Sequence, residues 1–224
     1  MRDFIKQTGQ NRDYFREQNY PKENSRNSLT SVKTRGIING RSSGKNDRII
    51  SDNHTFEKIG NIDFNDLKAI NKSLHEFEAK YKDSNIEHCR VFAKNGNVYE
   101  VHGNSYRVNT SLLGSENMGS INEHNHVTGE SEYSFSWEDL ESCADDGTKM
   151  AIAFDEKYRY YMMFPDKKLS EDEVYDAYEK AKRSVGNDMA LYPEKVKNGD
   201  EQHERIKRAC EKLGIKYLRQ EISR

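Results

Sequence analysis

Residues 56–224 alternate between amphipathic helical stretches and pairs of short β-rich runs, and this alternation constrains the fold more than any other feature of the sequence. One pair of runs flanks Asn95-Gly96, a dipeptide typical of tight hairpin turns. A second pair, within residues 149–165, is expected to turn at residues 155–157. Strands in hairpins between helices indicate an α/β (α+β) domain with a mixed or antiparallel sheet.

Three longer helices are expected around these hairpins. The first follows a cap at Asp63 or Asn65, and its apolar residues recur at spacings of three and four: Leu67, Ile70, Leu74, Phe77 and Tyr81. Ser170 and Glu173 form a capping box that starts the second helix. The third spans residues 199–214 and leads into a terminal strand.

Two shorter elements complete the expected domain. Residues 105–114 are β-rich enough to predict one more strand. Residues 136–146 predict a short helix that Gly147 would end.

Residues 1–55 show neither a helical nor a strand period, and their composition is that of loops. We therefore expect a disordered basic arm at 1–55 and a folded domain at 56–224. Residues 1–50 carry 11 Lys/Arg and 5 Asp/Glu, a balance of +6, whereas the remainder has a balance of −8. Such arms make weak nucleic-acid contacts or bind another chain in some proteins, and are solvated linkers in others.

Composition excludes several classes of protein. Only 33% of residues are apolar, and no apolar run approaches the roughly 18–20 residues of a membrane span. The N-terminus lacks the apolar stretch of a signal peptide, which predicts an intracellular protein without membrane contact. Cys89, Cys143 and Cys210 lie far apart, so neither a disulfide framework nor a Cys-rich zinc site is expected.

Two histidines at alternate positions, His124 and His126, point to the same side of an extended strand and can reach one cation. A hydrolytic zinc site uses three protein ligands and keeps a fourth position for water. Asp139, at the start of the following helix, supplies the third ligand in this interpretation, and Ser136 caps that helix beside the same cavity. The alternative is that both histidines are packed or exposed on a strand and that Ser136 is only a cap.

Residues 124–139, "HNHVTGESEYSFSWED", resemble the H-x-H-P-x-G…S-x-x-D signature of the JAB/MPN (JAMM) metalloenzymes, notably the RadC-like branch. They are still more similar to a domain at the C-terminus of minor head (head-morphogenesis) proteins of prophages. In that domain the motif follows a short hairpin, as residues 96–99 and Gly103 precede it here. The similarity spans roughly residues 60–165.

The resemblance implies a JAB/MPN-like fold and zinc-dependent hydrolysis of an amide. It implies that His124, His126 and Asp139 hold Zn²⁺, that Ser136 hydrogen-bonds the developing oxyanion, and that a glutamate moves the proton. The implied partners are a protein substrate or phage structural proteins. The implied location is the cytoplasm of a bacterial host, or the virion.

The sequence departs from the family pattern at three points. Val127 replaces the proline that follows the second histidine, and the loop to Ser136 has nine residues where the family has seven. No local motif fixes the glutamate. Glu100, on a hairpin strand that precedes the histidines, is the expected general base, with Glu116 and Glu123 as alternatives.

Three functions from different classes remain open on the sequence. The first is a zinc metallopeptidase or isopeptidase encoded by a prophage or similar element. The second is a non-catalytic phage structural or head-assembly module, in which the metal is structural or lost. The third is a metal-dependent nuclease, which only the basic arm and the histidines favour.

Overall fold

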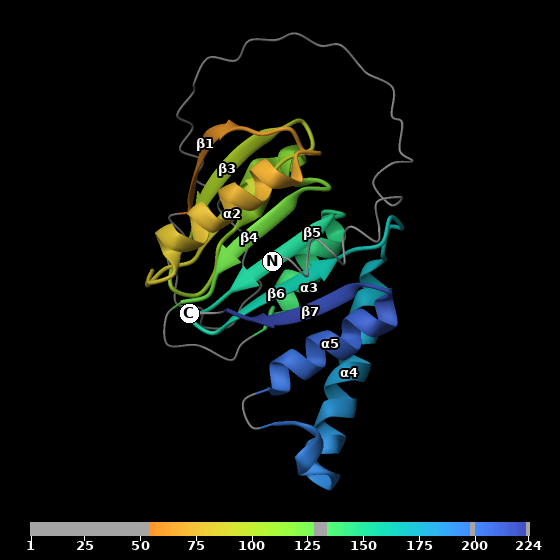
Figure 1. The fold of residues 1–224 in the computed structure, drawn as a ribbon. Coiled ribbons are helices and arrows are strands. Elements are labelled where there is room, and N and C mark those ends of the chain that lie inside the picture. Colours follow the sequence, from red (N-terminus) through yellow and green to blue (C-terminus); the bar gives the residue numbers. More distant parts are fainter. Residues whose placement is uncertain (1–53, 128–133, 198–199, 223–224) are drawn as a thin grey trace, which may run out of the picture. The chain divides into compact units, whose positions relative to one another are not determined.

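The computed structural model describes residues 54–127, 134–197 and 200–222. The predicted arm therefore lies outside the described residues up to residue 53, and the first strand begins at Thr55. At the centre is one seven-stranded sheet with the order β1-β3-β2-β4-β5-β6-β7 (Figure 1). The strands are β1 Thr55–Asn61, β2 His88–Phe92, β3 Asn97–His102, β4 Ile121–Asn125, β5 Met150–Phe154, β6 Tyr158–Met163 and β7 Lys216–Glu221.

All neighbouring strands are antiparallel except β4 and β5, which are parallel, so the sheet is mixed as the sequence allowed. The hairpins at Asn95-Gly96 and at residues 155–157 are confirmed. Gly96 has a φ of 89°, a left-handed conformation that glycine adopts without the clash of a Cβ atom.

The predicted helices are confirmed as α2 Leu67–Tyr81, α3 Trp137–Asp145, α4 Glu171–Leu191 and α5 Glu201–Leu213, and two short 3₁₀ segments are η1 Thr110–Asn117 and η2 Pro193–Lys195. The cap of α2 is Asp66, not Asp63 or Asn65. Its carboxylate accepts hydrogen bonds from the amides of Lys68 and Ala69, whereas the Asp63 carboxylate accepts from the amide of Asn65 in the preceding turn.

The prediction of a strand within residues 105–114 is wrong. Asn104 accepts hydrogen bonds from the amides of Tyr106 and Arg107, and Asn109 accepts from the amide of Ser111. These side chains turn the backbone and start η1 in place of a strand. Strand β1 was not predicted, because it is exposed on both faces and shows no apolar alternation.

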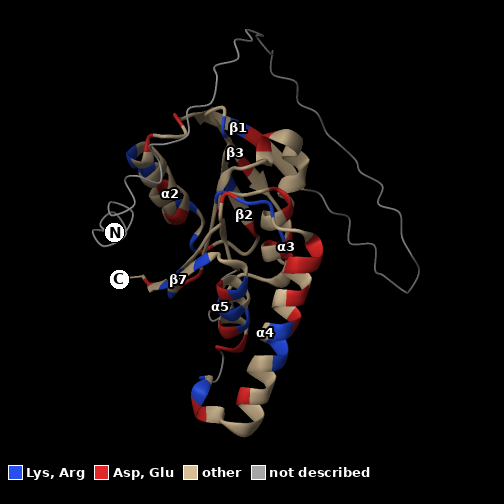
Figure 2. Ribbon diagram, turned by 90° about the vertical axis from the view of Figure 1, so that its right-hand side faces the viewer, with Lys and Arg blue, Asp and Glu red and all other residues tan. Residues whose placement is uncertain are grey.

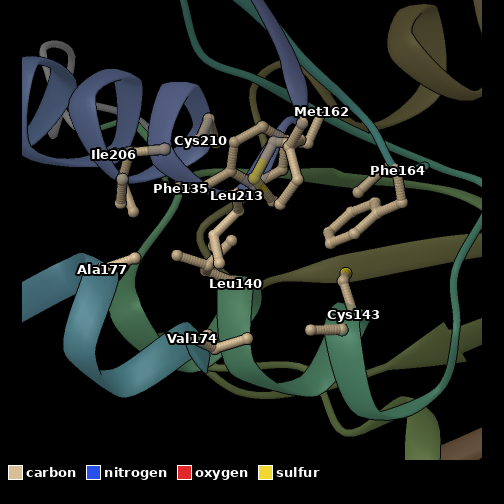
Figure 3. Close-up of a cluster of buried hydrophobic side chains, with 14 of the residues drawn as sticks. Phe135, Leu140, Cys143, Met162, Phe164, Val174, Ala177, Ile206, Cys210 and Leu213 are labelled. Atoms are coloured by element: carbon tan, nitrogen blue, oxygen red, sulfur yellow. The ribbon is translucent and has the colours of Figure 1, made fainter. Parts of the chain in front are cut away.

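The sheet has two covered faces. We call the face that carries Arg90, Glu100 and Glu123 the α2 face, because Arg90 and Glu100 bond to side chains of α2. The other is called the α3 face. There the largest core cluster joins β5 and β6 to the three C-terminal helices, and Figure 3 shows Phe135 and Leu140 within it.

Acidic side chains gather in the first turns of α3 and α4 (Figure 2). Negative charge at a helix N-terminus interacts favourably with the helix dipole. Among the described residues, no helix is long and apolar enough to cross a membrane.

Candidate metal centre

The structure brings together the three residues expected to bind a metal. His124 lies in β4, and His126 follows the end of that strand while its amide still bonds to the carbonyl of Phe154 on β5. The extended backbone therefore directs both imidazoles to the α3 face. Asp139 approaches from the first turn of α3, which covers this face.

The distances within this triad fit a tetrahedral cation. The Nε2 atoms of His124 and His126 are 3.2 Å apart, and His124 Nε2 lies 3.8 Å from Asp139 Oδ2. One donor atom from each residue lies within 4.8 Å of the others. Zinc bonds of about 2.0–2.1 Å in a tetrahedral site place ligand atoms roughly 3.3 Å apart. The donor set of two imidazoles and one carboxylate is also one that zinc accepts.

The Asp139 carboxylate faces the histidines and is also hydrogen-bonded within the cap of helix α3. Its Oδ2 accepts hydrogen bonds from the Ser136 amide at 2.7 Å and from the Ser136 hydroxyl at 2.8 Å. The Asp139 amide in turn donates to Ser136 Oγ at 3.0 Å. Burial opposes ionisation, but the His124 charge and the Ser136 amide together hold the pKa of Asp139 below its usual range. The carboxylate is thus ionised and oriented at neutral pH.

The Ser136 hydroxyl has only one proton, and in this arrangement it is donated to Asp139. Its expected role as an oxyanion donor requires the hydroxyl to rotate away from that carboxylate. The capping role is therefore the one that the geometry directly supports.

Aromatic and thiol groups border the triad. The Phe135 ring meets the His124 ring edge-on with centroids 5.8 Å apart, and the Tyr160 ring lies 6.3 Å from that of His126. Burial, with Asp139 nearby, raises the pKa of Cys143 to about 12. This thiol stays protonated at neutral pH and is a poor nucleophile or metal ligand.

The expected general base, Glu100, is on the wrong face of the sheet. It pairs across the strands with Arg90, and Arg90 pairs with Glu123, so these side chains share the α2 face. Glu100 bonds there to Arg90, to Lys80 at 2.8 Å and to Tyr81 at 2.7 Å. These partners hold the pKa of Glu100 at about 2 although burial opposes ionisation. The assignment of Glu100 as the base is therefore corrected.

The two alternatives are also displaced from the triad. Glu123 neighbours His124 in β4 and points to the α2 face, where it is fully buried. Glu116 accepts hydrogen bonds from Asn95 and Asn97 at the hairpin turn. That turn lies beyond Phe92, whereas Cys89, at the other end of β2, is opposite His124.

A glutamate that the sequence reasoning missed, Glu87, directly precedes β2 and is a candidate for the base. Cys89 is directly opposite His124, the last pair of this ladder, and the same antiparallel register extended by two residues would set Glu87 opposite His126. The backbone of Glu87 remains extended, since its amide bonds to Asn104 and its carbonyl accepts from Gly103. We infer from strand alternation that Glu87 faces the same side of the sheet as Cys89 and the histidines. No local pattern identifies it, because its place depends on the pairing of β2 with β4.

A second group of possible metal ligands, Glu57, Glu100 and His102, also has donor atoms within 4.8 Å of one another. Both oxygens of Glu100 are occupied there by Lys80, Tyr81 and Arg90. Two cations at one carboxylate oppose the binding of a third, so this group is a poor metal site.

Comparison with family models, curated proteins and solved structures finds no match to this chain. The features that bear on function are the geometry of the triad and the motif of residues 124–139.

Proposed function

We propose that this chain carries a zinc-dependent hydrolase site that cleaves an amide, as a peptidase or isopeptidase does, in a JAB/MPN-like domain of a prophage or similar element. The convergence of His124, His126 and Asp139 on one point carries this proposal. A bound zinc would lower the pKa of its water to about 7 and polarise the scissile carbonyl.

The protein's own groups have distinct roles in this proposal. The two imidazoles and the Asp139 carboxylate would hold the ion, and three protein ligands leave the fourth position of a tetrahedral zinc for water. Glu87 would accept the proton of the attacking water and deliver it to the leaving amine, because it lies two residues from Cys89, the residue opposite His124, in extended backbone. Ser136 orients Asp139, and after rotation its hydroxyl donates to the oxyanion.

A second candidate function is a phage structural or head-assembly module that uses the same fold without catalysis. The commitment of the Ser136 hydroxyl to Asp139 favours it, because a cap alone explains that contact. Its partners would be other phage structural proteins, whereas the hydrolase would act on a protein substrate, in the host cytoplasm or in the virion.

Metal analysis of the purified full chain tests the proposal. We expect one zinc per wild-type chain, with loss of zinc in His124→Ala and in Asp139→Asn, which keeps the size of the capping side chain. His75→Ala is the matched control, because His75 is half-exposed on α2 and should leave zinc content unchanged.

Cleavage of peptide and isopeptide substrates is then measured on the same proteins. Zinc-dependent cleavage that His124→Ala abolishes supports the hydrolase. Wild-type protein without zinc, or zinc-loaded protein that cleaves none of these substrates, overturns the hydrolase in favour of the assembly module.

A further inference from the structure

We propose that the C-terminal segment α5–β7 positions the metal ligands, through Tyr217 and Gln202 acting on residues 134–136. This inference rests on the proposed zinc site. It assigns a function to a part of the chain outside the metal-binding motif.

Two hydrogen bonds connect residues 134–135, which lead into helix α3 and Asp139, to the C-terminal segment α5–β7. Ser134 Oγ lies 2.7 Å from the hydroxyl of Tyr217 on β7. The Phe135 carbonyl accepts a hydrogen bond of 2.9 Å from the side-chain amide of Gln202 on α5. These partners are 83 and 67 residues away along the chain, so both contacts exist only in the folded domain.

The side chain of Phe135 adds a packing contact between the two segments. Phe135 is completely buried and belongs to the same core cluster as Ile206, Cys210 and Leu213 of α5 (Figure 3). Its ring also meets the His124 imidazole edge-on. One residue therefore touches both the C-terminal helix and a proposed ligand.

The connection reaches the third ligand through the helix cap. Residues 134 and 135 fix the backbone that enters Ser136, and the amide and hydroxyl of Ser136 both donate to Asp139 Oδ2. The same oxygen faces His124 at 3.8 Å. A shift of the backbone at Ser136 thus moves the carboxylate relative to the histidines.

Tyr217 is itself held in place. Its hydroxyl lies 2.7 Å from His203 Nδ1, which completes a chain of hydrogen bonds from Ser134 through Tyr217 to α5. Arg219 on β7 binds both carboxylate oxygens of Asp200, the residue before α5. A paired, bidentate contact of this kind limits the movement of β7 against α5.

Tyr217 and Gln202 are thus positioning residues: they orient the segment that carries Asp139. Removal of contacts that orient metal ligands weakens metal binding by about 10–100-fold in known sites. We expect a loss of about tenfold here, because Asp139 keeps its bonds to Ser136.

The test measures the zinc dissociation constant of the full chain by competition with a chromophoric chelator. Variants Tyr217→Phe and Gln202→Met each remove one hydrogen bond at nearly constant size, and Ser134→Ala removes the Tyr217 contact from the other side. The matched control is Tyr81→Phe, which loses a hydrogen bond of 2.7 Å to Glu100 on the α2 face. The thermal midpoint of each metal-free protein is measured in parallel.

We expect all three variants to bind zinc about tenfold more weakly than the wild type, and the control to bind it equally well. The control should lose thermal stability as the variants do, so that weaker zinc binding cannot be attributed to stability alone. Equal weakening in the control, or unchanged binding in Ser134→Ala and Gln202→Met, overturns the inference while the zinc site stands. Wild-type protein that binds no zinc overturns the proposed function, and this inference with it.

Discussion

Glu100 and His124 project from opposite faces of one sheet, since Glu100 pairs with Arg90 and His124 pairs with Cys89, the next residue along β2. No side-chain rotation carries a carboxylate through a covered sheet. An acid that acts beside the histidines must therefore point to the same face of the sheet as Cys89. Glu87 meets this condition, because it is two residues before Cys89 in extended backbone.

The variant Glu87→Gln should keep its zinc and lose activity by about 10²–10⁴-fold, because glutamine preserves size but cannot accept a proton. Zinc content and the cleavage rate of the same preparation check this. Glu116→Gln, which changes an acid at the distant hairpin turn, should retain full activity. Full activity in Glu87→Gln would show that another group takes the proton.

Glu100→Gln should destabilise the fold and leave zinc binding intact. The pKa of Glu100 is about 2 in the folded chain, against an ordinary value of 4.5. A depressed acid pKa contributes stability above pH 4.5, and this stability is lost as the pH falls toward 2; the difference amounts to about 3 kcal/mol. Urea unfolding should therefore separate variant from wild type at pH 7 and much less at pH 3. An equal difference at both values would contradict this origin of the stability.

The capping boxes at Ser136 and Ser170 give a matched pair of variants. Ser136→Ala and Ser170→Ala should each cost about 1 kcal/mol, since each removes the hydroxyl that accepts from the third helical amide. Only Ser136→Ala should also weaken zinc binding, because only its partner, Asp139, belongs to the triad. Denaturant unfolding of the metal-free proteins and chelator competition check the two effects separately.

The stability of the domain should fall as the pH drops from 6.5 to 4. Burial lowers the pKa of His88 to about 4. The charges of His102 and Lys80 lower this pKa further, whereas the charge of Glu100 raises it. A histidine with a depressed folded pKa binds its proton more readily when unfolded, so stability is lost as the pH falls from about 6.5 toward 4, by about 3 kcal/mol per group.

Burial also lowers the pKa of His203 to about 4. His203 should therefore contribute a similar loss of stability over the same pH range. The variant His88→Gln should therefore reduce, and not abolish, the slope of unfolding free energy against pH between 6.5 and 4. Urea titrations at pH 7, 6, 5 and 4 measure it. An unchanged slope would assign the effect to groups other than His88.

Short-range sequence patterns were sufficient to predict the helices and the hairpin turn that depend on them. The spacing of Ile70, Leu74 and Phe77, the Ser170 capping box and the Asn95-Gly96 turn each depend on residues a few positions apart. The proposed metal ligands could be chosen for the same reason, because strand alternation and one helix cap place His124, His126 and Asp139 within a short stretch.

The proposed general base could not be chosen in this way, because β2 and β4 are buried on both faces. Polarity does not mark the direction of a side chain on such strands: Glu123 and His124 are adjacent in β4, point to opposite faces of the sheet and are both buried. The identity of the opposing residue depends on the placement of β4 between β2 and β5. That order is set by long-range packing.

The outermost strands of the sheet, β1 and β7, are also the first and last strands within residues 54–222, as far as the structure describes them. The chain therefore enters and leaves the described sheet at its two margins, and β4, which carries His124, stays paired on both sides. A reporter protein or a surface tether should accordingly be tolerated at both ends, whereas circular permutation that cuts between β2 and β4 would separate Glu87 from the histidines in the covalent chain.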